Sequence, residues 1–389
     1  MRPILLILAI WVAGLGAAAQ YAKLAVGFDA LSEVYTDAGA ALGFAVSLLS
    51  LLGLVFGLSA GRLVARFGAK RALIGGLILG AAMSALEATL PALPLFLAAR
   101  TIEGLSHLAI VVAAPTLIAE TAPDRLRPAA MTLWSTFFSV AFAAAAWAGP
   151  AVIAAYGLDG LLLAHAVYLL AMAGLLAPVL PRATPGEPEV ARRAGILRQH
   201  LALYSDAWLS APGWGWLFYT FTFVAVLVLL PQIAPGAPVW LATVLPLAAI
   251  LTSLTLGVAL LSRLSAVSIS MLGFALAAGC TLWALFSPGT TTAVIALFLT
   301  LGLVQAAGFA AVPQLARRPA DRAMANGAIA QMGNLGNLTG TPVVLALLGI
   351  GGPQAALGAL IFCYLAGFGV HAVMARRRAR QPASESRAT

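Results

Sequence analysis

Twelve apolar stretches of helical length run through the sequence, and they restrict the possible fold more than any other feature. Each can cross about 30 Å of hydrocarbon at about 1.5 Å per residue. Backbone N–H and C=O groups in lipid need internal partners, so unbroken apolar runs indicate helices, whereas barrel strands alternate over about ten residues. We therefore predict an all-α polytopic membrane protein with twelve transmembrane helices, at residues 4–27, 40–60, 72–90, 95–119, 129–156, 161–180, 214–233, 239–262, 268–286, 291–315, 323–348 and 354–374.

The composition excludes a water-soluble globular domain, because 62% of the residues are hydrophobic and only 9% are charged. Soluble domains carry about a quarter charged residues. The net charge of +9 could suit a nucleic acid, but apart from Lys23 and Arg100 the cations fall before the first stretch, after even-numbered stretches or in the tail. This bias predicts cytoplasmic N- and C-termini in a bacterial inner membrane and no nucleic-acid partner.

Several kinds of chemistry find no support in the sequence. It contains no G-x-x-x-x-G-K-[ST] segment for ATP hydrolysis, and no Cys/His set has metal-ligand spacing. The G-x-S-x-G match at residues 57–61 ends a predicted membrane helix, whereas a hydrolase elbow needs a strand-to-helix turn. We therefore expect no enzymatic activity, no cofactor and no metal, and a protein that functions as a monomer.

The two halves of the sequence repeat each other. Gly61 and Gly257, Asp124 and Asp321, and Pro150 and Pro342 are pairs at spacings of 192 to 197 residues. Parallel repeats related by an axis along the membrane normal suit alternating access around a central site. The predicted parts are an N-terminal six-helix bundle at 1–180, a cytoplasmic linker at 181–213, a C-terminal six-helix bundle at 214–375 and a basic cytoplasmic tail at 376–389.

The loop after the second stretch reads GRLVARFGAKR and resembles the signature G-x-x-x-D-R-x-G-R-[KR]-[KR] of the major facilitator superfamily. With twelve predicted helices and a duplicated half, the resemblance covers essentially the whole chain. It implies a cytoplasmic gating loop, although Ala65 stands where the family has an acidic residue that helps to lock the two halves. A role in topology alone is the alternative. The residues concerned are Gly61, Arg66, Gly68, Lys70 and Arg71.

The fourth stretch contains RTIEG at residues 100–104, which is similar to the R-x-x-[QN]-G pattern of the same superfamily with Glu in place of the amide. Helical periodicity places Arg100, Glu103 and His107 on one stripe at mid-membrane depth. An isolated charge there costs several kcal/mol, so such residues pair or face a wet cavity. We predict a coupling and substrate site; a purely structural Arg100–Glu103 pair with His107 as its hydrogen-bonding neighbour is the alternative.

Two glycine-containing patterns concern helix shape. Gly149–Pro150 in the fifth stretch resembles the core of the superfamily's antiporter motif G-x-x-x-G-P-x-x-G-G without its flanking glycines, and a plain kink is the alternative. In the eleventh stretch Gly333, Gly336 and Gly340 share one face, which predicts that a neighbouring helix approaches closely.

Polar and aromatic residues that share helix faces predict further contacts with a substrate. Hydrogen bonds between helices are the alternative for the amides, and snorkelling to the interface is the alternative for Lys23. The cavity candidates are Gln20, Lys23, Ser135, Ser139, Tyr219, Phe223, Gln305, Gln331, Asn334 and Asn337.

These features predict a secondary active transporter that moves a small solute by alternating access, with protons as the coupling ion and Glu103 as the proton-binding residue. Fixed charges in mid-membrane come almost wholly from the N-terminal half, which favours a small organic anion or a neutral amphiphile. Efflux of amphiphilic compounds by proton antiport is one alternative, and a non-transporting membrane sensor on a transporter fold is another.

Overall fold

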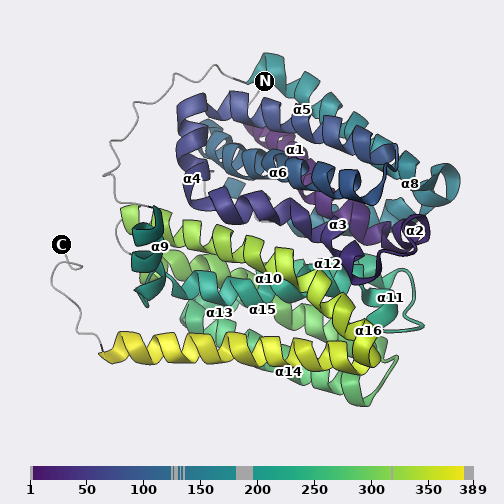
Figure 1. Cartoon of the computed structure of the whole chain (residues 1–389). Coiled ribbons are helices and arrows are strands. Elements are labelled where there is room, and N and C mark those ends of the chain that lie inside the picture. Colours follow the sequence, from purple (N-terminus) through teal and green to yellow (C-terminus); the bar gives the residue numbers. More distant parts are fainter. Residues whose placement is uncertain are drawn as a thin grey trace. The chain divides into compact units, whose positions relative to one another are not determined.

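The computed structural model describes residues 3–123, 126, 130–131, 133–134, 136–180, 196–316 and 319–380, and this part of the chain forms helices joined by turns, without a strand (Figure 1). Its contacts divide the chain into two compact units, unit 1 at Met1–Val190 and unit 2 at Ala191–Thr389. The predicted linker starts outside the described residues, and α16 continues to Arg380, past the predicted start of the tail at 376.

The described part of unit 1 contains five long helices and several short ones. Of the long helices, α1, α5, α6 and α8 pack on one another, and Ile10, Leu73, Ile110 and Leu169 meet in their common core. Small and apolar side chains allow this close packing, which stabilises helices in lipid through van der Waals contact. In order the elements are α1 Pro3–Val26, α2 Phe28–Val34, η1 Gly39–Leu42, α3 Gly43–Ser47, η2 Leu48–Ser50, α4 Leu51–Phe67, α5 Ala69–Ala88, α6 Leu93–Thr121 and α8 Phe137–Val179.

Unit 2 begins with a short helix and continues with a second bundle. Its main packings are α10 on α16, α14 on α15 and α16, and α12 on α15. In order the elements are α9 Ile196–Ser205, α10 Ala211–Val228, α11 Leu230–Ile233, α12 Leu241–Thr252, the π-helical turn η3 Ser253–Gly257, α13 Val258–Leu261, α14 Ala266–Phe286, α15 Thr291–Leu315 and α16 Pro319–Arg380.

Ten helices within the described residues are long and apolar enough to cross a membrane. Two of them are interrupted, α8 at Gly157 (φ 73°) and α16 at Gly351 and Gly352 (Gly352 φ 64°), so each consists of two helices in succession. A positive φ suits glycine because it has no Cβ. The predicted all-α polytopic fold is confirmed, and a count of twelve helices rests on dividing α8 and α16 at these glycines.

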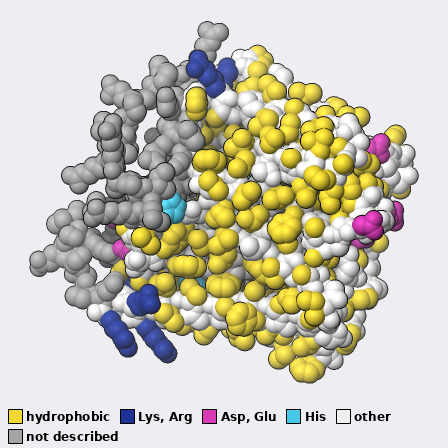
Figure 2. Space-filling view, viewed as in Figure 1, with side chains coloured by type: hydrophobic (Ala, Val, Ile, Leu, Met, Phe, Trp, Pro, Cys, Tyr) yellow, Lys and Arg dark blue, Asp and Glu magenta, His cyan; other side chains and the backbone are white. Residues whose placement is uncertain are grey.

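The exterior is as apolar as a membrane protein requires. Figure 2 shows a face on which hydrophobic side chains predominate. Large apolar side chains are highly exposed, among them Trp147, Phe286 and Ile350, at 77%, 77% and 83%. Water-soluble proteins rarely expose contiguous apolar surface on this scale. The chain is therefore a multi-pass membrane protein.

The glycine face of α16 is in contact with α10, as the sequence predicts. A Cβ on Gly333 would lie 2.8 Å from the Trp216 ring, one on Gly336 would lie 2.5 Å from Leu217 O, and one on Gly340 would overlap Phe221 O. Backbone atoms lie directly against Gly336 and Gly340, so movement of a side chain alone could not make room for a Cβ there. The prediction of close helix approach is confirmed.

Gly336→Ala is therefore expected to lower the free energy of unfolding by about 1–3 kcal/mol, the usual cost of overpacking. Gly349 on the same helix is the matched control, because a Cβ there meets nothing within 4 Å. Denaturant unfolding in detergent measures both variants. Equal stability of the two would contradict the close approach of α10 and α16.

Candidate functional site

Two of the three polar residues predicted on the fourth span lie fully buried in unit 1. Arg100 and Glu103 are 0% exposed on α6, and Arg100 Nη1 donates a hydrogen bond to Glu103 Oε2. Arg100 Nε also donates to Ala45 O at 2.7 Å, and Nη2 donates to Gln20 O at 2.8 Å. Carbonyl groups of α3 and α1 thereby fix the guanidinium group in one orientation.

Helices α1 and α5 add two further charges. Lys23 Nζ lies 2.7 Å from Glu87 Oε2 and 2.9 Å from Glu103 Oε1, and Arg100 Nη1 lies 3.4 Å from Glu87 Oε1. We refer to Lys23, Glu87, Arg100 and Glu103 as the charge cluster. Each carboxylate contacts both cations, and no member is more than 2% exposed. With all four groups ionised, the two positive and two negative charges cancel.

The structure corrects one interpretation of Lys23 and adds a residue that the sequence analysis missed. Snorkelling of Lys23 is wrong, because its ammonium group is buried and also donates to Ser84 Oγ at 2.8 Å. Glu87 was not singled out, although it is an acidic residue inside the apolar stretch 72–90. A charge within a predicted span is the signal that pointed to Arg100, and it would have pointed to Glu87 too.

The two histidines of unit 1 have different relations to the charge cluster, and His107 is only half-buried. His107 Nδ1 donates to Ala17 O at 3.0 Å, and its ring stands edge-on to Tyr21 with centroids 5.2 Å apart. This hydrogen bond goes to α1, so the described residues do not show His107 as the hydrogen-bonding neighbour of Arg100 and Glu103 that the structural alternative required. The part of His107 in the coupling and substrate site stays a prediction. His165 of α8 lies against the charge cluster, with Nδ1 3.4 Å from Lys23 Nζ.

Gln20 lies beside the charge cluster with one end of its amide unpaired. Its Nε2 donates to Ser106 Oγ at 2.8 Å, while the fully buried Oε1 has no partner among the described residues. Reversing the amide would pair Oε1 with Ser106 and leave Nε2 unpaired, so one end stays free in either orientation. A buried unpaired polar group costs about 1–3 kcal/mol, which a polar group on a ligand would offset.

The other cavity candidates have mixed environments. Ser139 is buried on α8, Ser135 lies outside the described residues, and Asn334 donates to Ala330 O within its own helix at 2.8 Å. Tyr219 and Phe223 are buried in a row of stacked rings on α10 that begins at Trp216. The amide oxygens of Gln305 and Asn337 are buried without a partner among the described residues.

Gln331 has a contact that the substrate interpretation did not foresee. Its Oε1 accepts a hydrogen bond from Tyr204 of α9 at 2.7 Å, and its Nε2 lies 3.0 Å from His200 Nε2. Burial raises the pKa of Tyr204 to about 12, so the phenol stays a neutral donor. Gln331 therefore makes the hydrogen bonds between helices that the alternative for the amides describes, and these bonds anchor α9 to α16. Contact of Gln331 with a substrate stays a prediction.

The predicted gating loop forms the turn between α4 and α5. Gly68 has φ 86° and joins the two helices, and Lys70 Nζ donates to Leu180 O at 2.6 Å. Gly61 lies in α4 and Arg71 is exposed on α5, while the side chain of Arg66 lies outside the described residues. A left-handed glycine makes this tight turn possible. The gating role itself stays a prediction.

The Gly149–Pro150 pair lies inside α8, whose non-helical residue is Gly157. A Cβ on Gly149 would lie 2.7 Å from Val26 Cγ1, so the glycine allows α8 to approach α1 closely. This contact gives Gly149 a packing role. Any role of the pair in antiport stays a prediction.

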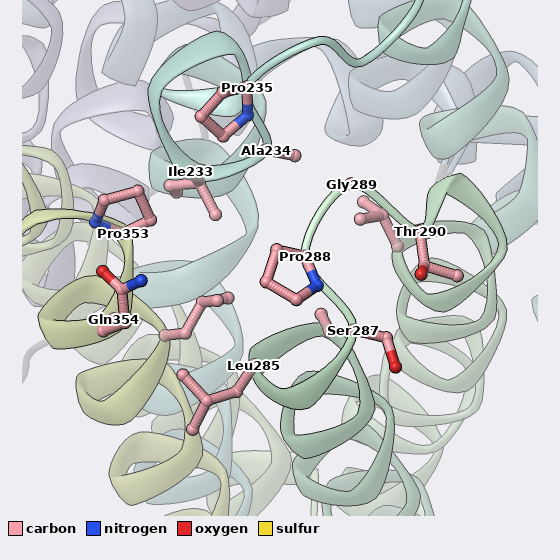
Figure 3. A pocket seen from close by; sticks show the side chains of 13 residues that line it. Ile233, Ala234, Pro235, Leu285, Ser287, Pro288, Gly289, Thr290, Pro353 and Gln354 are labelled. Carbon is pink, nitrogen blue, oxygen red and sulfur yellow. The ribbon is translucent and has the colours of Figure 1, made fainter.

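Unit 2 contains a cavity of about 320 Å³, which none of the predicted site residues lines (Figure 3). It lies between the end of α11, the turn from α14 to α15 and the second part of α16. Its lining contains no charged side chain, and Ser287, Thr290 and Gln354 supply its polar side chains. The lining has no titratable side chain that could take up a coupling proton, so the charge cluster is the better candidate for the functional site.

Comparisons with known proteins agree with the fold and the motifs. A family model described as Major Facilitator Superfamily matches residues 6–239, which is more than half of the chain. The 4-hydroxybenzoate transporter PcaK of Pseudomonas putida is 33% identical over 160 residues, 40% of this chain and 36% of that relative. The crystal structure of the human organic anion transporter MFSD10 (TETRAN) has a TM-score of 0.70 at 16% identity, over 95% of this chain and 100% of that chain.

Proposed function

Because the chain belongs to the major facilitator superfamily, we propose that it is a secondary active transporter that carries a small organic anion together with a proton. The family resemblance drawn from residues 61–71 and 100–104 is thereby confirmed. The proposal places the protein in a bacterial inner membrane, as a monomer with both termini in the cytoplasm, in accordance with the distribution of its cations.

The charge cluster is the observation that carries this proposal. Its charges balance only while Glu87 and Glu103 are both ionised. Uptake of a proton by Glu103 leaves two cations and one carboxylate, and an uncompensated charge is costly at membrane depth. A substrate anion can restore the balance by becoming the second anion. Proton and anion then favour each other's binding, and this coupling is reciprocal.

The same balance indicates the charge of the substrate. One proton leaves one net positive charge, and a monovalent anion neutralises it. A dianion would leave a net negative charge beside Glu87. We therefore propose a monocarboxylate that moves with one proton, so that the complete step transfers no net charge.

Two observations support a hydroxylated aromatic acid as the substrate. The relative PcaK is named for 4-hydroxybenzoate, although the matched part spans little more than a third of that protein. In addition, Gln20, whose main-chain carbonyl group accepts a hydrogen bond from Arg100, offers a buried side-chain amide with one unpaired end. A carboxylate on the cations and a hydroxyl group on Gln20 would satisfy both features.

Reconstitution into proteoliposomes tests the proposal. An inward proton gradient is expected to drive accumulation of labelled 4-hydroxybenzoate, a protonophore is expected to abolish it, and clamping the membrane potential with potassium and valinomycin is expected to leave the rate unchanged. The uncharged 4-hydroxybenzamide is the control substrate.

Two results would contradict the proposal. Accumulation that is driven by an outward proton gradient would support the alternative of proton antiport. Transport that no proton gradient affects in either direction would exclude both forms of proton coupling.

A further inference from the structure

His165 of α8 contacts the charge cluster, yet the proposed transport step does not use it. It is 7% exposed, and its ring reaches three groups. Nε2 lies 3.0 Å from Gly16 O, while Nδ1 lies 3.0 Å from Ser84 Oγ and 3.4 Å from Lys23 Nζ. The ring therefore stands between the backbone of α1 and the ammonium group of Lys23.

The partners of His165 determine where its proton lies. A backbone carbonyl only accepts hydrogen bonds, so Nε2 carries the hydrogen and donates it to Gly16 O. In a neutral imidazole the other nitrogen then has a free lone pair. That lone pair, on Nδ1, faces Lys23 and Ser84. A second proton on Nδ1 would point an N–H group at the ammonium group, so this arrangement requires neutral His165.

Lys23 has more acceptors around it than protons to donate. Its ammonium group carries three protons. Four acceptors lie within 3.4 Å of Nζ, namely Glu87 Oε2, Glu103 Oε1, Ser84 Oγ and His165 Nδ1. Ser84 also donates to Leu162 O at 2.9 Å, which leaves its oxygen free to accept from Lys23. One acceptor is therefore in excess while Glu103 is ionised.

The competition changes when Glu103 takes up a proton. A protonated carboxyl group carries no charge and its oxygen becomes a weaker acceptor, so the three other acceptors can take the three protons of the ammonium group. We propose that His165 is the positioning residue that takes over from Glu103 and holds the charged Lys23 in place to receive the substrate anion. The inference rests on the proposed function.

The groups that face His165 come from each helix packed around it. They are Lys23 and the Gly16 carbonyl group of α1 and Ser84 of α5, with the charges of Glu87 and Arg100 nearby. Among these, only the lysine donates a charged hydrogen bond toward Nδ1. The role of His165 therefore acts through Lys23 and not through direct contact with the substrate.

Two substitutions of His165 test the roles of Nδ1 and Nε2 separately. The oxygen of His165→Asn can replace Nδ1 and accept from Lys23, whereas the amide nitrogen of His165→Gln can replace Nε2 and donate to Gly16 O. We expect 4-hydroxybenzoate to bind about tenfold more weakly to the Gln variant than to the Asn variant, the effect of losing one hydrogen bond to a charged group. The affinities of the two variants are compared by equilibrium binding to the purified proteins, together with KM and kcat for exchange.

Tyr168→Phe is the matched control. Tyr168 also lies on α8 and donates to the backbone of α1, at Val12 O, but it does not contact the charge cluster among the described residues. Loss of this hydrogen bond is expected to leave the affinity for 4-hydroxybenzoate unchanged. If the only role of His165 were to tie α8 to α1, the Gln variant would bind 4-hydroxybenzoate more tightly than the Asn variant. Either that result or equal affinity of the two variants would overturn the inference.

A measurement that needs no transport distinguishes failure of this inference from failure of the proposed function. The sequence contains 4 histidines, so ¹⁵N-histidine spectra can be assigned by comparison with the His165→Gln variant. The expected form of His165 is the neutral tautomer protonated at Nε2. Protonation at Nδ1 would overturn the inference even if transport were observed, whereas the expected tautomer without binding of 4-hydroxybenzoate would contradict only the proposed substrate.

Discussion

Glu103→Gln is expected to reduce proton-driven accumulation of the substrate about a hundredfold or more while exchange across the membrane continues. The amide resembles the protonated carboxyl group, so the cluster keeps two cations and one carboxylate at every pH. The anion can then bind and be carried without a proton, but the gradient no longer drives it. Uptake into proteoliposomes without preloaded substrate measures proton-driven accumulation, and uptake into preloaded proteoliposomes measures exchange.

Glu87→Gln is the matched control, because it removes the other carboxylate of the same cluster. Both carboxylates accept hydrogen bonds from both cations, but the bond from Arg100 to Glu87 is long, at 3.4 Å. Glu87→Gln also leaves two cations and one carboxylate, so the anion can bind to it without a proton, but the remaining carboxylate is Glu103, which can still take up a proton. We therefore expect exchange by Glu87→Gln to keep a dependence on pH that Glu103→Gln has lost. If exchange by Glu103→Gln kept its pH dependence and exchange by Glu87→Gln lost it, the proton site would be Glu87.

Arg100→Met is expected to lower the free energy of unfolding by about 3–5 kcal/mol, as removal of one partner from a buried ion pair does. Arg100 has no solvent exposure, and its loss leaves Lys23 with two carboxylates and a net negative charge. The Ala45 and Gln20 carbonyl groups also lose their donor. Chemical unfolding in detergent, followed by circular dichroism, measures the change.

A second substitution tests whether charge is the cause. Arg100→Met combined with Glu103→Gln leaves one cation and one carboxylate, so we expect the double variant to recover most of the lost stability. Arg71→Met removes an exposed arginine and is expected to change stability by no more than about 0.5 kcal/mol. A double variant that was less stable than Arg100→Met would show that shape, and not charge balance, dominates.

The sequence predicted the Arg100–Glu103 pair and named Lys23 as a separate cavity candidate, but it did not predict that these residues meet or that Glu87 joins them. Arg100 and Glu103 could be found because one turn of a single helix brings them together, and local periodicity is sufficient for that. Glu87 and His165 come from α5 and α8, and only the packing of those helices brings them to Lys23. His107 shares the stripe of Arg100 and Glu103, but the neighbouring α1 gives it a different partner.

In unit 2, too, the sequence predicted which residues make contacts and the structure identified their partners. The spacing of Gly333, Gly336 and Gly340 predicted a close helix contact without naming the partner, which the structure identifies as α10. The amide of Gln331 lay on a predicted polar stripe, yet its partners belong to α9, far away in the sequence. A stripe shows that a residue needs a partner and does not show which one.

The sequence by itself determined that this chain crosses a membrane as a bundle of helices and that it resembles a transporter family, because lipid forces backbone groups to pair within each helix and the apolar length of each helix is local. Only the tertiary structure decided which charges neutralise one another. Ion pairs between helices depend on the rotation and depth of each helix in the bundle, and these are fixed by side-chain packing between segments that are distant in the sequence.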